Sequence, residues 1–242
     1  MKYENIKKGV FLERPNRFVA LVEVDGEVQK AHVKNTGCCR ELLVPGTTVF
    51  LQDFAGNMGT RKLRYSLIGV VKKENGLLIN MDSQAPNKVV NEALLSGDLT
   101  LPHMDKITLV KGEKTFGNSR FDFYLEDASG GMAFMEVKGV TLESSGIAMF
   151  PDAPTQRGVK HINELIAARE NGYNAYILFV IQMEGMDVFT PNYKTHPEFG
   201  EALLKAKASE VHILARQCKV GEDSLILNGG EEIRIDLEPS NF

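Results

Sequence analysis

The hydrophobic pattern of this 242-residue chain changes its period near Pro86. Before that residue, apolar and polar residues alternate along short runs such as residues 17–24 and 27–33, and the turn Asp25-Gly26 between them is typical of a β-hairpin. After it, four apolar residues recur at helical spacing: Val89, Val90, Ala93 and Leu94. We therefore expect two domains, residues 1–83 built from strands and residues 84–242 containing helices.

The first part of the chain predicts a small β-barrel. Further strand-like runs at residues 47–53, 63–71 and 77–81 follow the hairpin, without a convincing helix between them. Four or five short strands of this kind fit an antiparallel barrel, of which the OB-fold is one kind.

Basic and aromatic residues gather around the expected strand ends and loops of this barrel. The basic residues are Arg14, Arg17, Arg40, Arg61, Lys62 and Arg64, and the aromatic residues among them are Phe18, Phe54 and Tyr65. Small barrels often grip single-stranded nucleic acid in this way, through phosphate contacts and base stacking. A solvated basic face over core aromatic residues is at least as good an interpretation of the same pattern.

The second part alternates between strands and helices. After the first helix we expect strands at residues 107–110, 121–125 and 132–137, a helix at 161–171, a strand at 175–181, a helix at 199–209 and a strand at 211–215. Strands that first follow one another and then alternate with helices predict a mixed sheet flanked by helices, an α/β (α+β) architecture.

Charge is distributed unequally between the two parts. The net charge of -4 argues against a protein that simply coats DNA, because such binding relies on cationic side chains that displace phosphate counterions. Residues 1–83 nevertheless hold 13 Lys and Arg against 9 Asp and Glu, a balance of +4, whereas residues 84–242 hold 15 against 23, a balance of -8. The basic first part is therefore the better candidate for contact with nucleic acid.

The chain shows no signal for a membrane. Its first dozen residues are too polar for a secretory signal, and no stretch approaches the roughly 18 apolar residues of a membrane span. We expect a cytoplasmic protein without a membrane partner.

Two strands of the second part present charged side chains that could perform chemistry. The strand period of two places Glu136 and Lys138 on one face of their strand, and it turns Asp122 away from the apolar face of residues 121–125. If the two strands pair across residues 127–131, Asp122 comes within reach of Glu136. Two carboxylates on adjacent strands can hold Mg²⁺, and a neighbouring lysine can position water or offset developing charge. The alternative is an ion pair on a solvated sheet.

The segment of residues 150–161 opens a helix, with Thr155 or Asp152 as its N-cap. Arg157, Lys160 and His161 could form a phosphate cradle at the start of this helix. An ordinary helix start punctuated by prolines explains the same residues.

Two further residues are secondary candidates for the same site. Gln182 follows a strong strand and could reach the carboxylates, and Glu92 on the first expected helix could supply another carboxylate. A strand boundary and a solvated helix face are the ordinary interpretations of these two residues.

The order of Asp122, thirteen intervening residues and Glu136-Val137-Lys138 resembles the pattern of the PD-(D/E)xK nuclease superfamily. Longer motifs follow one another along the chain: Glu13-Arg14-Pro15-Asn16-Arg17-Phe18, Asn35-Thr36-Gly37 with Glu41-Leu42-Leu43-Val44-Pro45-Gly46, Ser119-Arg120-Phe121-Asp122-Phe123, Glu136-Val137-Lys138-Gly139-Val140-Thr141-Leu142, and Phe150-Pro151-Asp152-Ala153-Pro154-Thr155-Gln156-Arg157-Gly158. Through these motifs the whole chain resembles the sugar fermentation stimulation protein A (SfsA) family.

The resemblance implies an N-terminal OB-like β-barrel, a C-terminal PD-(D/E)xK nuclease-like domain, DNA binding and a role in regulating sugar utilisation. It assigns Asp122 and Glu136 to metal binding and Lys138 to catalysis, in agreement with the strand faces. Phe121 stands where a proline often precedes the aspartate in the superfamily, a position that varies.

Three hypotheses follow. The first is a Mg²⁺- or Mn²⁺-dependent phosphodiesterase that binds nucleic acid, DNA in preference to RNA, through Arg14, Arg17, Arg40, Arg61, Lys62 and Arg157, and cuts it at Asp122, Glu136 and Lys138. The second is a non-catalytic DNA-binding transcriptional regulator that retains the nuclease fold. The third is a pocket for a small phosphorylated metabolite. The sequence leaves open whether the chain forms a homo-oligomer.

Overall fold

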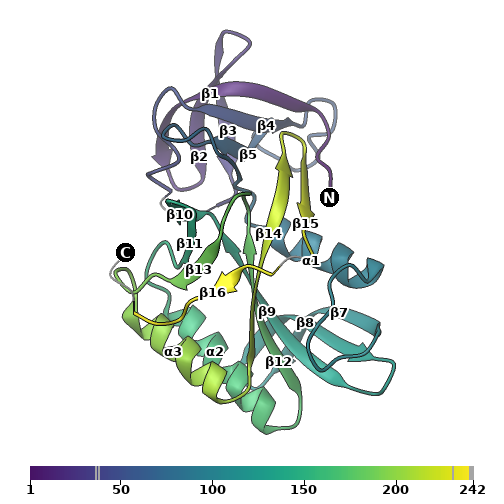
Figure 1. Ribbon diagram of the computed structural model, residues 1–242. Coiled ribbons are helices and arrows are strands. Elements are labelled where there is room, and N and C mark those ends of the chain that lie inside the picture. Colours follow the sequence, from purple (N-terminus) through teal and green to yellow (C-terminus); the bar gives the residue numbers. More distant parts are fainter. Residues whose placement is uncertain (36, 38, 231, 240–242) are drawn as a thin grey trace. The chain divides into compact units, whose positions relative to one another are not determined.

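The computed structural model describes residues 1–35, 37, 39–230 and 232–239, and it divides into two compact units (Figure 1). The first unit comprises Met1–Ala85, Gln182–Glu184 and Cys218–Ile226, and the second comprises Pro86–Ile181, Gly185–Gln217 and Leu227–Phe242. Two short segments that the sequence division at residue 83 assigns to the second domain therefore belong to the first unit. Thr36, in one of the sequence motifs, lies outside the described residues.

The first unit is a β-barrel. Its strands run in the order β3-β2-β1-β4-β5-β6, and a parallel pairing between β3 and β5 closes the barrel. This strand order, closed between β3 and β5, is of the OB type, as the sequence predicts. The strands are β1 (Ile6–Asn16), β2 (Val19–Val24), β3 (Glu27–Val33), β4 (Thr48–Asp53), β5 (Tyr65–Val71) and β6 (Leu78–Asn80).

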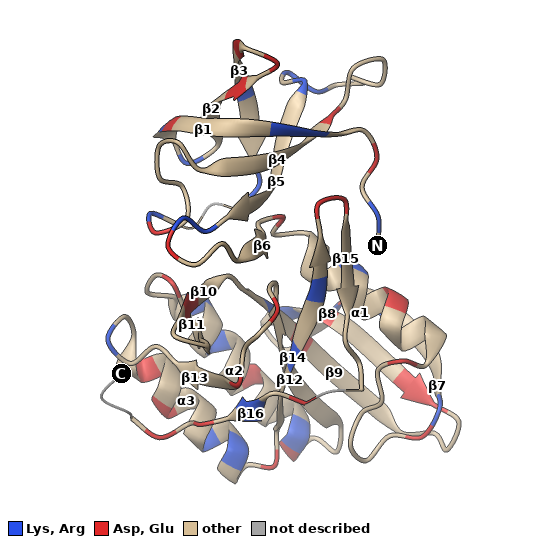
Figure 2. Cartoon of the chain, turned by 45° about the horizontal axis from the view of Figure 1, so that its top comes forward, with Lys and Arg blue, Asp and Glu red and all other residues tan. Residues whose placement is uncertain are grey.

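The alternation of side chains along β2 and β3 explains how these strands pack. Ala20, Val22 and Val24 of β2 are buried, and so are Ala31 and Val33 of β3, because they share the inner face of the barrel. The residues between them point outward. Basic residues lie on β1 and on the loops of the barrel (Figure 2).

The second unit is built around a mixed sheet with the strand order β15-β14-β12-β9-β8-β7. β12 runs parallel to β9 and β14, whereas β8 runs antiparallel to both β7 and β9. A smaller sheet has the order β10-β11-β13-β16. The mixed sheet expected from the element order is thus confirmed.

The elements of the second part of the chain have the following bounds: α1 (Ala85–Ser96), β7 (Ile107–Phe116), β8 (Ser119–Asp127), β9 (Met132–Val140), β10 (Leu142–Ser144), β11 (Ile147–Phe150), α2 (Gln156–Glu170), β12 (Asn174–Ile181), β13 (Val188–Pro191), α3 (Pro197–Ala208), β14 (His212–Gly221), β15 (Ser224–Leu227) and β16 (Arg234–Ile235). Figure 1 shows α2 and α3 side by side, and α2 also packs against β8, β9 and β12. This packing places the start of α2 beside the central strands.

No helix in the described part of the chain is both long enough and apolar enough to cross a membrane.

An ion pair holds the two ends of the connection between β4 and β5. Asp53 accepts hydrogen bonds from Arg64 Nε at 2.7 Å and from Arg64 Nη2 at 2.6 Å, at the end of β4 and just before β5. These hydrogen bonds to Arg64 hold the pKa of Asp53 below its ordinary value. The pair therefore anchors the loop that carries Arg61 and Lys62.

We predict that this ion pair makes the stability of the first unit depend on pH. A carboxyl whose folded pKa is lowered stabilises the fold above its unfolded pKa of about 3.9, and this contribution is lost as the pH falls through the folded pKa. Asp53→Asn should therefore lower the free energy of unfolding at neutral pH and make it less sensitive to acid, as measured by urea unfolding. Asp25→Asn breaks the exposed pair with Lys7 (3.0 Å) and should have a smaller effect. Equal effects of the two substitutions would contradict this account.

Candidate functional site

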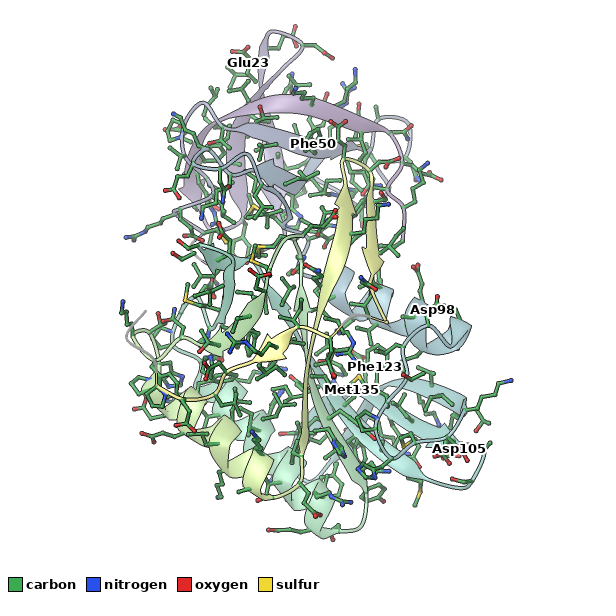
Figure 3. The ribbon with its side chains drawn as sticks, in the orientation of Figure 1. Glu23, Phe50, Asp98, Asp105, Phe123 and Met135 are labelled. Carbon is green, nitrogen blue, oxygen red and sulfur yellow. The ribbon has the colours of Figure 1, made fainter. Side chains whose placement is uncertain are left out.

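The geometry of the candidate site starts from the pairing of β8 with β9. Phe123 and Met135 are cross-strand partners, and both are labelled in Figure 3. This pair ends the register, and Asp122 and Glu136 are the next residues on the two strands. The structure thus brings the two carboxylates and Lys138 together in the way the strand faces predict.

Glu136 is a buried carboxylate, with 3% of its surface exposed. Its Oε1 atom accepts a hydrogen bond from Lys138 Nζ at 2.6 Å and also bonds to His161 Nδ1. Burial raises the pKa of Glu136, but the bond to His161 and the charge of Lys138 outweigh it and leave the pKa below its ordinary value. The second oxygen, Oε2, is buried and has no hydrogen-bond partner among the described residues.

Asp122 is held by two donors. Its Oδ2 accepts a hydrogen bond from the Val137 backbone N–H at 2.8 Å, and its Oδ1 accepts one from Asn87 Nδ2 at 2.8 Å. Burial raises the pKa of Asp122, and the negative charge of Glu136 raises it further, against the opposing effect of the two donors. The site therefore favours the ionised form of Glu136, whereas burial and the charge of Glu136 disfavour the ionised form of Asp122.

Helix α2 supplies the next layer of the site. Thr155 is its N-cap, with Oγ1 accepting a hydrogen bond from the Gly158 N–H at 3.0 Å. One turn later, buried His161 reaches Glu136, while exposed Arg157 donates from Nε to His161 Nε2 at 3.4 Å. Because Nε2 accepts from Arg157, Nδ1 carries the proton and donates to Glu136.

Lys160 also lies in the first turns of α2, but its ammonium points elsewhere. It donates to the backbone carbonyl of Asn118 at 2.8 Å, in the turn between β7 and β8. The phosphate cradle suggested by the sequence is therefore reduced to the exposed Arg157 beside His161.

The carboxylates of Asp122 and Glu136 suit a hard divalent cation. Among the described residues, no group of three or more His, Cys, Asp and Glu is arranged as a complete metal site. Mg²⁺ does not require one, since it is commonly held by one or two carboxylates while water and substrate phosphates fill its other positions. Two adjacent carboxylates offer that donor set, and one of them has a buried oxygen without a partner among the described residues.

The two secondary candidates, Gln182 and Glu92, lie outside β8, β9 and α2. Gln182 belongs to the first unit, where its buried amide nitrogen donates to Asn80 Oδ1 at 3.0 Å and to the backbone carbonyl of Asp82 at 3.2 Å. Glu92 is exposed on α1. It follows Asn87 by five residues, which places it about 140° around the helix from the side chain that reaches Asp122.

Asn87 is the residue that sequence reasoning missed. It stands in the first turn of α1, where an asparagine is an ordinary polar residue, and its partner lies 35 residues away in the chain.

The basic residues of the barrel divide into two groups. Arg14 donates to the backbone carbonyls of Arg17 (2.7 Å), Asn35 (2.8 Å) and Gly37 (2.8 Å), so it holds loops together. Arg64 is paired with Asp53, and Arg61 stacks on the Phe54 ring at 3.7 Å. Arg17, Arg40, Lys62 and Arg64 are exposed, and of these four only Arg64 forms an ion pair within the described part of the chain.

Comparisons with known proteins agree with this organisation. The model of the family "Sugar fermentation stimulation protein RE domain" matches residues 84–224, and that of the "SfsA N-terminal OB domain" matches residues 12–81. A "Sugar fermentation stimulation protein homolog" of Desulfitobacterium hafniense is 55% identical and covers 98% of this chain and 99% of its own. A protein of the same name from Clostridium beijerinckii is 54% identical and covers 93% of this chain and 96% of its own.

A solved structure is also similar over nearly the whole chain. It is that of Pyrococcus furiosus SfsA in complex with Ca²⁺, which is 30% identical, covers 98% of both chains and has a TM-score of 0.84.

The repulsion between the two carboxylates predicts that the site destabilises the metal-free fold. Asp122→Asn removes one of the two charges, so at neutral pH in EDTA it should raise the free energy of unfolding by about 1 kcal/mol, a size common for substitutions that relax functional sites. The same variant should gain less stability than the parent when Mn²⁺ is added. Urea unfolding with and without metal measures both effects. Asp98→Asn, at an exposed position after α1, is the control and should behave as the parent does (Figure 3). A destabilised Asp122→Asn protein in EDTA would contradict the prediction.

Proposed function

The chain belongs to the sugar fermentation stimulation protein family, and from this premise we propose that it binds DNA and hydrolyses phosphodiester bonds with a divalent cation at Asp122 and Glu136. The observation that carries the proposal is the buried Oε2 atom of Glu136, which has no partner among the described residues. A buried carboxylate oxygen without a hydrogen-bond donor costs stability, and a second carboxylate beside it adds to that cost. A bound cation would compensate both charges at once.

We propose Mg²⁺ or Mn²⁺ as the cation. The oxygen ligands of Asp122 and Glu136 suit both, and the similar protein of Pyrococcus furiosus was solved in complex with Ca²⁺, another hard divalent cation. When bound, such a cation supplies Lewis acidity toward a phosphoryl oxygen and lowers the pKa of water.

The side chains around the carboxylates have distinct tasks in this proposal. Lys138, whose side chain is 17% exposed and lies 2.6 Å from Glu136 Oε1, keeps an ammonium where it can orient water or offset charge that develops on the phosphate. His161 fixes the orientation of Glu136 through its hydrogen bond, so it is a positioning residue. Arg157 is exposed beside His161, where its guanidinium can contact a phosphate of the substrate.

In this proposal the first unit binds the substrate. Its exposed cations, Arg17, Arg40 and Lys62, can contact phosphates, and the barrel is of a type that binds single strands. We propose DNA as the substrate in preference to RNA, and the cleavage experiment below includes both.

A second function is a DNA-binding regulator of sugar utilisation that retains the site without turnover. The observation that favours it is the name of the relatives, which describes stimulation of sugar fermentation and no reaction. The presence of Lys138 against Glu136 favours catalysis instead, because binding of a cation for shape alone does not require an ammonium at that place.

The test is cleavage of labelled single- and double-stranded DNA and RNA in Mg²⁺, Mn²⁺ or EDTA. We expect cutting that depends on the metal, with Glu136→Ala and Lys138→Ala each reducing the rate by about 100-fold or more, as loss of an electrostatic catalytic group does. Glu170→Ala and Lys111→Ala remove the same charges at exposed positions and should cut as the parent does.

Two other outcomes have defined meanings. Full metal-dependent cleavage by Asp122→Ala or Lys138→Ala would contradict the assignment of the site. Binding of DNA by the parent without any cutting would favour the regulator.

A further inference from the structure

A hollow of about 340 Å³ lies on the outer surface of the barrel. It is lined by Phe18, Val19, His32, Arg61, Lys62 and Leu63, all of which belong to the first unit. Val19 and His32 are cross-strand partners on the outward face of β2 and β3. The other residues lie in the β1–β2 turn and in the connection between β4 and β5. In OB-folds, this strand face and these two loops are where oligonucleotides bind.

Phe18 forms one wall of the hollow and is unusually accessible for a large apolar side chain, with 44% of its surface exposed. Three hydrogen bonds hold the turn that carries it. The Phe18 N–H donates to Asn16 Oδ1 at 2.9 Å, the Phe18 carbonyl accepts from the Val33 N–H at 2.8 Å, and Arg14 holds the Arg17 carbonyl at 2.7 Å. The fold therefore presents an aromatic face to solvent instead of burying it, at the expense of hydrophobic stabilisation.

Positive charge surrounds this aromatic face. The Arg17 guanidinium lies 4.6 Å from the centre of the Phe18 ring, Lys62 is exposed on the rim, and no lining residue is acidic. Arg61 is held by stacking on Phe54, and its Nε is buried without a partner among the described residues. Burial lowers the pKa of His32, and the charges of Arg61 and Lys34 lower it further, as expected for a ring in a positive environment.

We propose that this hollow receives one unstacked base of single-stranded DNA, stacked on Phe18, with the flanking phosphates at Arg17 and Lys62. An aromatic face between cations matches an aromatic base between phosphates. The volume lies at the small end of the range for ligand pockets, which suits a single base. Bases within a duplex are paired and stacked, so they enter only where the duplex is opened. The inference rests on the DNA binding of the proposed function and assigns it to single strands.

The chain contains no tryptophan, so a single Phe18→Trp substitution introduces the only indole, and it lies in the hollow. We expect its fluorescence to be quenched when a thymine oligonucleotide is added in EDTA, because the indole stacks on a base. An oligonucleotide of abasic sites has the same phosphates and should quench much less, and a duplex should quench less than either of its strands. An RNA oligonucleotide that quenches as strongly as DNA would overturn the assignment to DNA.

The matched control is Val28→Trp, at an exposed apolar position (62%) of β3 about 13 Å along the strand from His32. Its fluorescence should not respond. Anisotropy of a labelled oligonucleotide measures binding separately, and Phe18→Ala should weaken it by about 5- to 150-fold, the range of one base–aromatic stack, while Val28→Ala should not.

The possible failures are distinguishable. If the oligonucleotide binds while the indole of the Phe18→Trp variant stays unquenched and Phe18→Ala binds normally, the base pocket is overturned and the proposed nuclease site is untouched. If the parent shows no metal-dependent cleavage while the indole of the Phe18→Trp variant is still quenched in EDTA, the nuclease is overturned and the pocket is supported. Absence of any oligonucleotide binding would overturn both.

Discussion

The electrostatic repulsion between Asp122 and Glu136 is the constraint around which the second unit is organised. Two carboxylates with little exposure to water are held on neighbouring strands. His161 and Lys138 compensate the charge of Glu136, whereas the charge of Asp122 is compensated only in part. Such an arrangement persists only where the surrounding structure determines it, because buried charges without sufficient partners oppose folding. The surrounding contacts therefore explain how the fold tolerates the pair.

Those contacts come from elements on both sides of the sheet's central strands. β9 is hydrogen-bonded to β8 on one side and to β12 on the other; Glu136 pairs with Ile177 of β12, and its neighbour Met135 pairs with Phe123 of β8. Asn87 from α1 and His161 from α2 each donate a hydrogen bond to one of the carboxylates. Side chains that belong to separate helices thus converge on one site, and each uses a polar group to hold a carboxylate in a defined orientation.

This organisation explains which parts of the site could be predicted from sequence. The strand period is a local property, so it was sufficient to place Asp122, Glu136 and Lys138 together and to predict a barrel followed by a mixed sheet. The contribution of Asn87 and the location of Gln182 depend on tertiary packing over 35 and about 100 residues of chain, and no local pattern encodes them. The assignment of Gln182–Glu184 and Cys218–Ile226 to the first unit has the same origin.

The cations of the barrel illustrate why composition alone is a poor guide to a binding surface. The excess of positive charge in residues 1–83 includes Arg14, which holds backbone carbonyls, and Arg64, which is neutralised by Asp53. These two side chains shape the turn of Phe18 and the β4–β5 connection, and they have little capacity left for phosphates. The accessible charge includes Arg17, which lies over the exposed Phe18 ring, and Lys62, which lines the same hollow as Phe18. Recognition of a single strand would then depend less on the total charge of the barrel than on how Arg14 and Arg64 position the accessible residues Arg17 and Lys62.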